Sequence, residues 1–185
     1  DERYIVEQSM MSLFPLEKPV YGAVEPGETD WCRLTAEETA AGGRVSGELH
    51  YSGAAGAAET AYTLSGTAFE QEGQRRYAVA ACFYLAFLDL MKALPEAARA
   101  AGKLVLPPWG MLTGVRPDKP VTWALMEGKS PEEAKAYLKA HYFVPEERAA
   151  LALETGIVGY QARKRLAARD IDLYVGIPFC PTRCA

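Results

Sequence analysis

Residues 44–51 read RVSGELHY, and residues 60–64 read TAYTL. In the first segment apolar and polar side chains alternate, which is typical of a strand with one face buried and one face in water. The second segment alternates in the same way through Thr60, Tyr62 and Leu64. Between them, residues 52–56 read SGAAG and are small enough for a chain reversal. The pair predicts a β-hairpin or meander, and residues 31–34 are expected to add a short strand.

Helical patterns flank this predicted hairpin. A short helix is expected from Tyr4 to Phe14, ended by the proline at position 15. A longer one is expected from about Phe69 to Leu94, with Val79, Phe83 and Phe87 on its flank. Its central face is predicted to consist of residues three or four positions apart, namely Tyr77, Ala81, Tyr84, Leu88 and Met91. We therefore expect residues 1–106 to form an α+β accessory domain, a small antiparallel sheet packed with helices.

Residues 107–170 are expected to form a helical segment. Ser130 to Glu133 has the form of a capping box with proline at the first helical position, so a helix is predicted from Pro131 to Tyr142. Another helix is predicted to open at Pro145 and to end in a basic run over residues 163–169. Its buried face is predicted to consist of Leu151, Thr155, Val158, Ala162 and Leu166.

Residues 171–177 read IDLYVGI, a short run rich in β-branched residues, and predict a buried strand. Cysteines follow it at 180 and 184. Two thiolates in a loop beyond a strand can converge on one iron–sulfur cluster, because soft sulfur ligands suit iron. The spacing alone is equally consistent with two unrelated thiols, and less so with a disulfide. Cys32 and Cys82 lie in apolar surroundings and are predicted to be buried free thiols without function.

The composition sets limits on the function. The chain has 185 residues, 49% of them hydrophobic, and a formal net charge of -4. A chain of this length can bury roughly 70% of its unfolded surface, so it needs neither metal nor disulfide to fold. The acidic balance argues against nucleic acid as a partner. The longest apolar run, residues 77–88, is shorter than the roughly 20 residues that span a membrane, so no membrane association is expected.

The end of the sequence resembles a known motif. Residues 174–184, YVGIPFCPTRC, resemble the first barrel strand and cluster loop of radical S-adenosylmethionine (radical SAM) enzymes, in particular the oxygen-independent coproporphyrinogen III oxidase group. In that group a third cysteine follows, which would fall at position 187. Residues 112–119, LTGVRPDK, and the two helix openings at 130 and 145 resemble the N-terminal extension of the HemZ branch, the coproporphyrinogen dehydrogenase-like proteins.

The resemblance implies roles for three residues. Cys180 and Cys184 would be the first two ligands of a 4Fe-4S cluster, and Tyr174 would contact SAM, although a strand aromatic packed in the barrel explains Tyr174 equally well. In that family the reduced cluster cleaves SAM to a 5'-deoxyadenosyl radical that abstracts hydrogen from the substrate. The family reaction converts two propionates of coproporphyrinogen III to vinyl groups in heme biosynthesis. The protein would position the cofactor and exclude water.

Other features have simpler explanations. The turn from Gly114 to Lys119 places two cations beside a helix start, so an anion contact there is an alternative to a structural turn. The basic run is expected to be a solvated helix end. His50 and His141 have no ligand partners at a useful spacing and are expected to be ordinary side chains.

These observations give one principal interpretation. The chain is expected to be the accessory N-terminal region of a cytoplasmic radical SAM enzyme, with residues 171–185 the first strand and cluster loop of a truncated barrel. Its partners would be the missing C-terminal barrel and a tetrapyrrole substrate. The fragment alone is expected to bind no cofactor and to be inactive. Two alternatives stay open: a tetrapyrrole-, RNA- or partner-binding module, and a heme-chaperone-like radical SAM branch.

Overall fold

A three-stranded antiparallel sheet organises the N-terminal part of the computed structural model, which describes residues 3–25, 27–112, 116–167, 169–171, 173 and 175–176. Its strands are β1 (Trp31–Thr39), β2 (Gly42–Tyr51) and β3 (Ala54–Thr63), in the order β1-β2-β3. The predicted meander is confirmed. The reversal between β2 and β3 needs only Ser52 and Gly53, whose φ angles of 52° and 80° are those of a tight hairpin turn.

The first strand is longer than expected. It continues past the predicted end at Leu34 to Thr39, because β2 extends far enough to pair with all of it. Residues 36–39 of β1 read AEET and are mostly polar, so a hydrophobic pattern could not reveal that they are paired.

The two faces of the sheet differ as the alternation predicts. Val45 and Leu49 of β2 are 1% and 2% exposed and face the core. On the other face, Arg44 pairs with Glu59 of β3 at 2.9 Å, and both side chains are more than half exposed. Such exposed pairs contribute at most about 1 kcal/mol each. Burial of the inner face therefore fixes the sheet.

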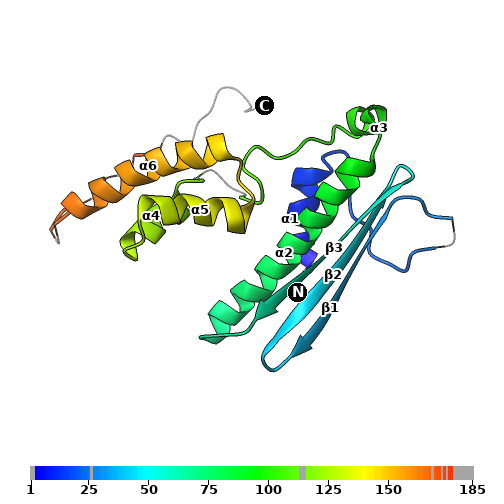
Figure 1. Cartoon of the computed structure of the whole chain (residues 1–185), viewed down its shortest axis with the longest axis horizontal. Coiled ribbons are helices and arrows are strands. Elements are labelled where there is room, and N and C mark those ends of the chain that lie inside the picture. The colour runs from blue at the N-terminus through cyan, green and yellow to red at the C-terminus, as the bar shows by residue number, and fades with distance from the viewer. Residues whose placement is uncertain are drawn as a thin grey trace.

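Helix α2 (Ala68–Ala93) lies along the inner face of the sheet (Figure 1). Thr67 and Glu70 form a capping box at its start, so its first amides are satisfied. The helix was predicted within two residues at each end, but its central face was predicted only in part. Ala81 and Tyr84 of the predicted face are 2% and 6% exposed, whereas Tyr77, Leu88 and Met91 are only half-buried. The predicted flank of Val79, Phe83 and Phe87 is buried, as are Cys82, Ala86 and Leu90.

Helix α1 (Arg3–Leu13) packs beside α2 and confirms the predicted N-terminal helix (Figure 1). Phe14, just after it, is 5% exposed and packs edge-on against Phe87, with ring centroids 5.3 Å apart. Its ring also lies 5.4 Å from that of Tyr51. These aromatic contacts connect α1, α2 and β2 in one core.

Four further helices complete the described chain: α3 (Glu96–Ala101), α4 (Lys119–Met126), α5 (Pro131–Tyr142) and α6 (Glu146–Arg165). The bounds of α5 and its capping box between Ser130 and Glu133 are as predicted. The last three helices share a second core that includes Val121, Leu138, Val144 and Ala152. Figure 1 shows them grouped to one side of α2 and away from the sheet.

Candidate functional site

The segment with the predicted cluster ligands follows α6. Tyr174, Cys180 and Cys184 all lie outside the described residues. Of the predicted strand 171–177, residues 171, 173, 175 and 176 are described, and they form no strand. Ile171, Leu173 and Val175 are 90%, 87% and 75% exposed. The expected burial is therefore not found at these positions, since no described strand pairs with them and an unpaired strand leaves its backbone groups unsatisfied.

Helix α6, which leads into this segment, is fixed by close backbone packing. A Cβ atom at Gly156 would lie 2.5 Å from Cγ1 of Val121, so only glycine permits the approach of α6 to α4. The hydroxyl of Thr122 donates to the carbonyl oxygen of Gly156 at 3.3 Å. Ala149 and Ala152 are fully buried on the same side. The inner side of α6 is thus lined by small residues.

The outer side of α6 carries the face that the sequence predicted to be buried, and that prediction is wrong. Leu151, Val158 and Leu166 are 43%, 66% and 51% exposed, and Thr155 and Ala162 between them are exposed as well. The larger apolar side chains suggested the core-facing side. The structure instead buries the small ones, because they let the helix backbones approach closely.

The basic end of α6 is solvated, as expected. Arg163, Lys164 and Arg165 are exposed in the last turn, where cations suit the negative end of the helix dipole. Lys164 lies over the ring of Tyr160 at 5.3 Å. In the turn before α4, the side chains of Arg116 and Lys119 are exposed, and residues 113–115 lie outside the described part. The anion contact considered for this turn stays untested.

The two thiols in the described chain are unsuited to metal. Cys82 is fully buried, and its Sγ donates to the carbonyl oxygens of Val45 and Ala58 at 3.4 and 3.3 Å. Burial raises the pKa of Cys82, and it raises the pKa of Cys32 to about 12. Both groups therefore stay protonated near neutral pH, whereas a metal ligand must be a thiolate. The prediction that they are buried free thiols is confirmed for Cys82, and Cys32 is free and partly buried.

Each histidine stacks on an aromatic ring. His50 lies opposite Trp31 across β1 and β2, with ring centroids 3.9 Å apart. His141, near the end of α5, lies 3.7 Å from Tyr77 and 4.7 Å from Tyr137. Desolvation lowers the pKa of His141. Among the described residues no group of three or more His, Cys, Asp or Glu side chains could hold a metal ion.

A groove that no sequence pattern predicted lies between α1, the loop after it and β1. Its larger hollow has a volume of about 380 Å³, with a floor that includes Met10, Phe14 and Leu49 and a rim that includes Lys18 and Asp30. Such a volume and an apolar floor with a polar rim are typical of small-molecule sites. The sequence showed residues 22–30 only as a loop, and no local pattern predicts where a loop folds back.

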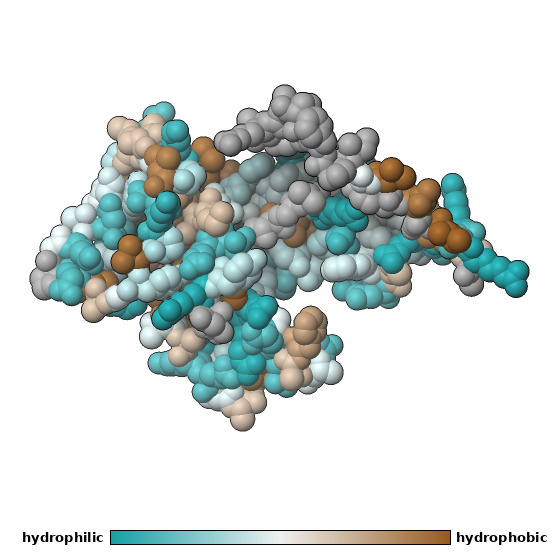
Figure 2. Space-filling model, turned by 180° about the vertical axis from the view of Figure 1, so that it is seen from behind, coloured by the Kyte–Doolittle hydropathy of each residue, from teal (hydrophilic) through white to brown (hydrophobic). Residues whose placement is uncertain are grey.

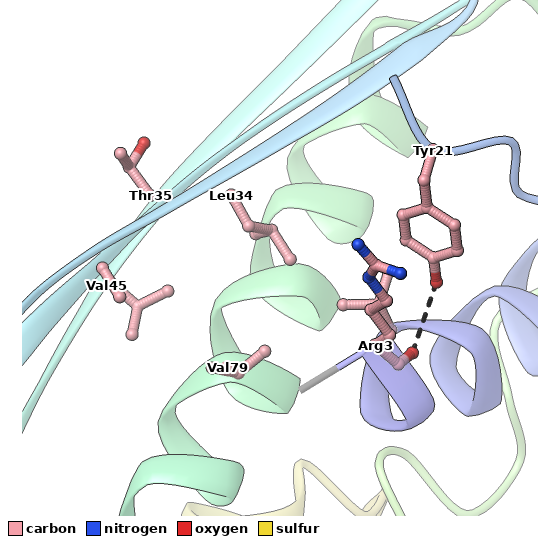
Figure 3. A pocket seen from close by; sticks show the side chains of 8 residues that line it. Arg3, Tyr21, Leu34, Thr35, Val45 and Val79 are labelled. Carbon is pink, nitrogen blue, oxygen red and sulfur yellow. Dashed lines mark hydrogen bonds between the residues drawn. The ribbon is translucent and has the colours of Figure 1, made fainter. Parts of the chain in front are cut away.

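A smaller hollow of about 260 Å³ adjoins the groove, and both are lined by Val6 and Tyr21. Figure 3 shows Arg3 and Tyr21 on one side of this hollow, with Leu34, Val45 and Val79 on the other. The Tyr21 hydroxyl donates to the backbone oxygen of Arg3 at 3.4 Å and to the Glu7 carboxylate at 3.2 Å. The loop is therefore attached to the first turns of α1.

None of the helices in the described residues is long and apolar enough to cross a bilayer.

Comparison with curated proteins finds a significant relative. The chain is similar to the oxygen-independent coproporphyrinogen-III oxidase-like protein HemZ of Bacillus subtilis (strain 168), with 39% identity over 85 residues. The aligned part covers 42% of this chain and 16% of that protein. No family model matches the chain, and no solved structure matches it significantly. Over the aligned part, this similarity confirms the HemZ-like relation that the sequence motifs predicted.

Proposed function

We propose that this chain is the N-terminal accessory part of a radical SAM enzyme similar to HemZ, and that its last residues lead into the catalytic barrel. The observation that carries the proposal is the 39% identity with HemZ, whose name describes it as similar to the oxygen-independent coproporphyrinogen-III oxidases. The aligned part is 16% of that relative, so catalysis would belong mainly to regions beyond this match.

The thiols of this chain divide into two classes, which supports the proposal. Cys180 and Cys184 follow an apolar segment and are separated by three residues, a donor set whose soft thiolates suit iron. Cys32 and Cys82 are held as neutral thiols among apolar side chains. We assign cluster binding to Cys180 and Cys184 and none to the other two.

The proposed chemistry needs few residues from this chain. When bound, a 4Fe-4S cluster and SAM would supply one-electron chemistry for oxidising a substrate such as the propionates of a porphyrinogen. Cys180 and Cys184 would hold the cluster, and Tyr174 would orient SAM. The described part would serve as a folded scaffold in front of that site, inactive when separated from the barrel, in a cytoplasmic enzyme of heme biosynthesis.

Anaerobic iron–sulfur reconstitution of the complete protein tests the proposal. Cys180→Ala and Cys184→Ala should each lower the bound iron and the visible absorption of the cluster. Cys32→Ala is the matched control and should retain both. Full iron content in the Cys180→Ala/Cys184→Ala double variant, or no iron in the natural protein, would overturn the assignment.

The groove favours a second candidate function, the binding of a tetrapyrrole or another flat apolar molecule by the N-terminal part. Its floor is apolar and its rim carries charges of both signs, including Lys18 and Asp30. Titration of the 185-residue chain with coproporphyrin, followed by tryptophan fluorescence, tests this function, because Trp31 lines the groove. A saturable change that Met10→Phe weakens would support it, and the absence of any change would exclude it.

A further inference from the structure

One side of α6 carries exposed, mostly apolar side chains from Leu151 to the end of the helix. We call Leu151, Thr155, Val158, Ala162 and Leu166 the α6 stripe. These positions are spaced four, three, four and four residues apart, so they lie on one side of the helix. Figure 2 shows hydrophobic side chains gathered at the end of the molecule that α6 occupies.

The one polar member of the α6 stripe is satisfied within the helix. The hydroxyl of Thr155 donates to the backbone oxygen of Leu151 at 3.0 Å and to that of Ala152 at 3.1 Å. This leaves its methyl group available for contacts. The stripe therefore offers a continuous apolar surface, although the opposite side of α6 already packs in the core through Ala149, Ala152 and Gly156.

A second exposed apolar run follows α6 almost at once. Ile171, Leu173 and Val175 occupy every second position, and each is at least 75% exposed. In a strand, alternate residues share a face, so these three would lie on one face and Tyr174 on the other. Only four positions, 167–170, separate this run from Leu166 at the end of the stripe.

We propose that the α6 stripe is the docking surface for the outer face of the sheet that begins at residues 171–177, in the catalytic part of this same protein. The inference rests on the proposed function and deepens it. A helix covers a sheet by laying an apolar side on an apolar face. Ile171, Leu173 and Val175 would turn toward α6, while Tyr174 would point to the inside, where SAM is proposed to bind. The two exposed apolar surfaces would then be buried against each other.

Cysteine labelling measures whether the α6 stripe is covered. Ala162 and Gln161 are adjacent and both exposed, but they point about 100° apart around the helix. We would prepare Val158→Cys, Ala162→Cys and Gln161→Cys in the 185-residue chain and in the complete protein. A maleimide would be the probe, with the labelled site read by peptide mass spectrometry.

The expected result is site-specific. Labelling at 158 and 162 should be at least about tenfold slower in the complete protein than in the 185-residue chain, whereas labelling at 161 should change little. Equal rates at 158 and 162 in the two proteins would overturn the proposal. Slow labelling in the 185-residue chain that becomes fast on dilution would also overturn it, because a second copy would then be the occupant. Neither iron nor SAM enters this measurement, so its failure would leave the cluster test intact.

Discussion

The hydroxyl of Tyr77 donates to the backbone oxygen of His141 at 2.9 Å, and the two rings stack with centroids 3.7 Å apart and planes 6° apart. Tyr77 belongs to α2 and His141 to α5, so this contact joins the sheet-bearing part to the helical part. A second stack, between Tyr84 and Phe143, lies about two turns further along α2, with ring centroids 5.4 Å apart. The helices that lead to residues 171–185 are thus attached to the N-terminal core through aromatic rings.

Stepwise truncation of Tyr77 should weaken its contact with His141 and lower the free energy of unfolding in two steps. Tyr77→Phe keeps the ring and removes the hydrogen bond, and should lower the free energy of unfolding by about 1 kcal/mol. Tyr77→Ala also removes the stack and half-buried apolar surface, and should cost about 2–3 kcal/mol. Urea unfolding followed by circular dichroism measures both. Equal stability of Tyr77→Ala and the natural chain would contradict the role of this contact.

His141 should make the stability depend on pH. Burial lowers its pKa in the folded chain, so the unfolded chain binds more protons between that lowered value and the ordinary value near 6.5. The free energy of unfolding should therefore fall as the pH drops through this window, by no more than about 1.4 kcal/mol per pH unit. His141→Phe keeps an aromatic ring but cannot titrate, and should flatten the curve between pH 7 and 5. An unchanged curve would show that His141 does not contribute.

Glu146 should titrate far below an ordinary glutamate. Its carboxylate accepts from the ammonium groups of Lys135 and Lys139, which lower its pKa to about 2. The stabilisation is present above the ordinary pKa and should be lost as the pH falls toward 2. Lys135→Met and Lys139→Met should each raise the pKa measured by carboxyl-carbon NMR. A Glu146 pKa that stays the same in both variants would exclude these pairs in solution.

Two glycines should respond in opposite directions to the same substitution. A Cβ atom at Gly56 of β3 would overlap the backbone of Ala86 and Leu90 in α2, so Gly56→Ala should cost about 1–3 kcal/mol or more. Gly73 is exposed within α2 and has no neighbour within 4 Å, so Gly73→Ala should stabilise the chain by about 1 kcal/mol. Thermal unfolding of the two variants compares them directly. A gain in stability for Gly56→Ala would contradict the packing of α2 on the sheet.

The sequence predicted those elements whose signals are local. Ser130, Pro131 and Glu133 predicted the start of α5, since a capping box depends only on neighbouring residues. The alternation of β2 predicted which side of it is buried, because the period of a strand has only two phases. The bounds of α2 were predicted by the length of its apolar pattern.

Which side of a helix is buried depends on residues that are distant in sequence. The apolar pattern of α6 therefore did not predict its buried side. Leu151 and Val158 suggested the buried side of α6, but close packing of Gly156 on Val121 selects the opposite side. The groove beside α1 depends on how the loop after Phe14 folds back, which no periodicity encodes. The proposed ligands Cys180 and Cys184 were recognised by motif alone, and they lie outside the described residues.

We propose above all that this chain leads into a SAM-cleaving iron–sulfur site held by Cys180 and Cys184. The most direct test of this proposal is to incubate the reduced, reconstituted complete protein with SAM and to quantify 5'-deoxyadenosine. We expect 5'-deoxyadenosine to form with the natural protein and with Cys32→Ala, and we expect Cys180→Ala or Cys184→Ala to abolish it. Undiminished formation in the Cys180→Ala and Cys184→Ala variants, or none in the natural protein with its iron bound, would contradict the account.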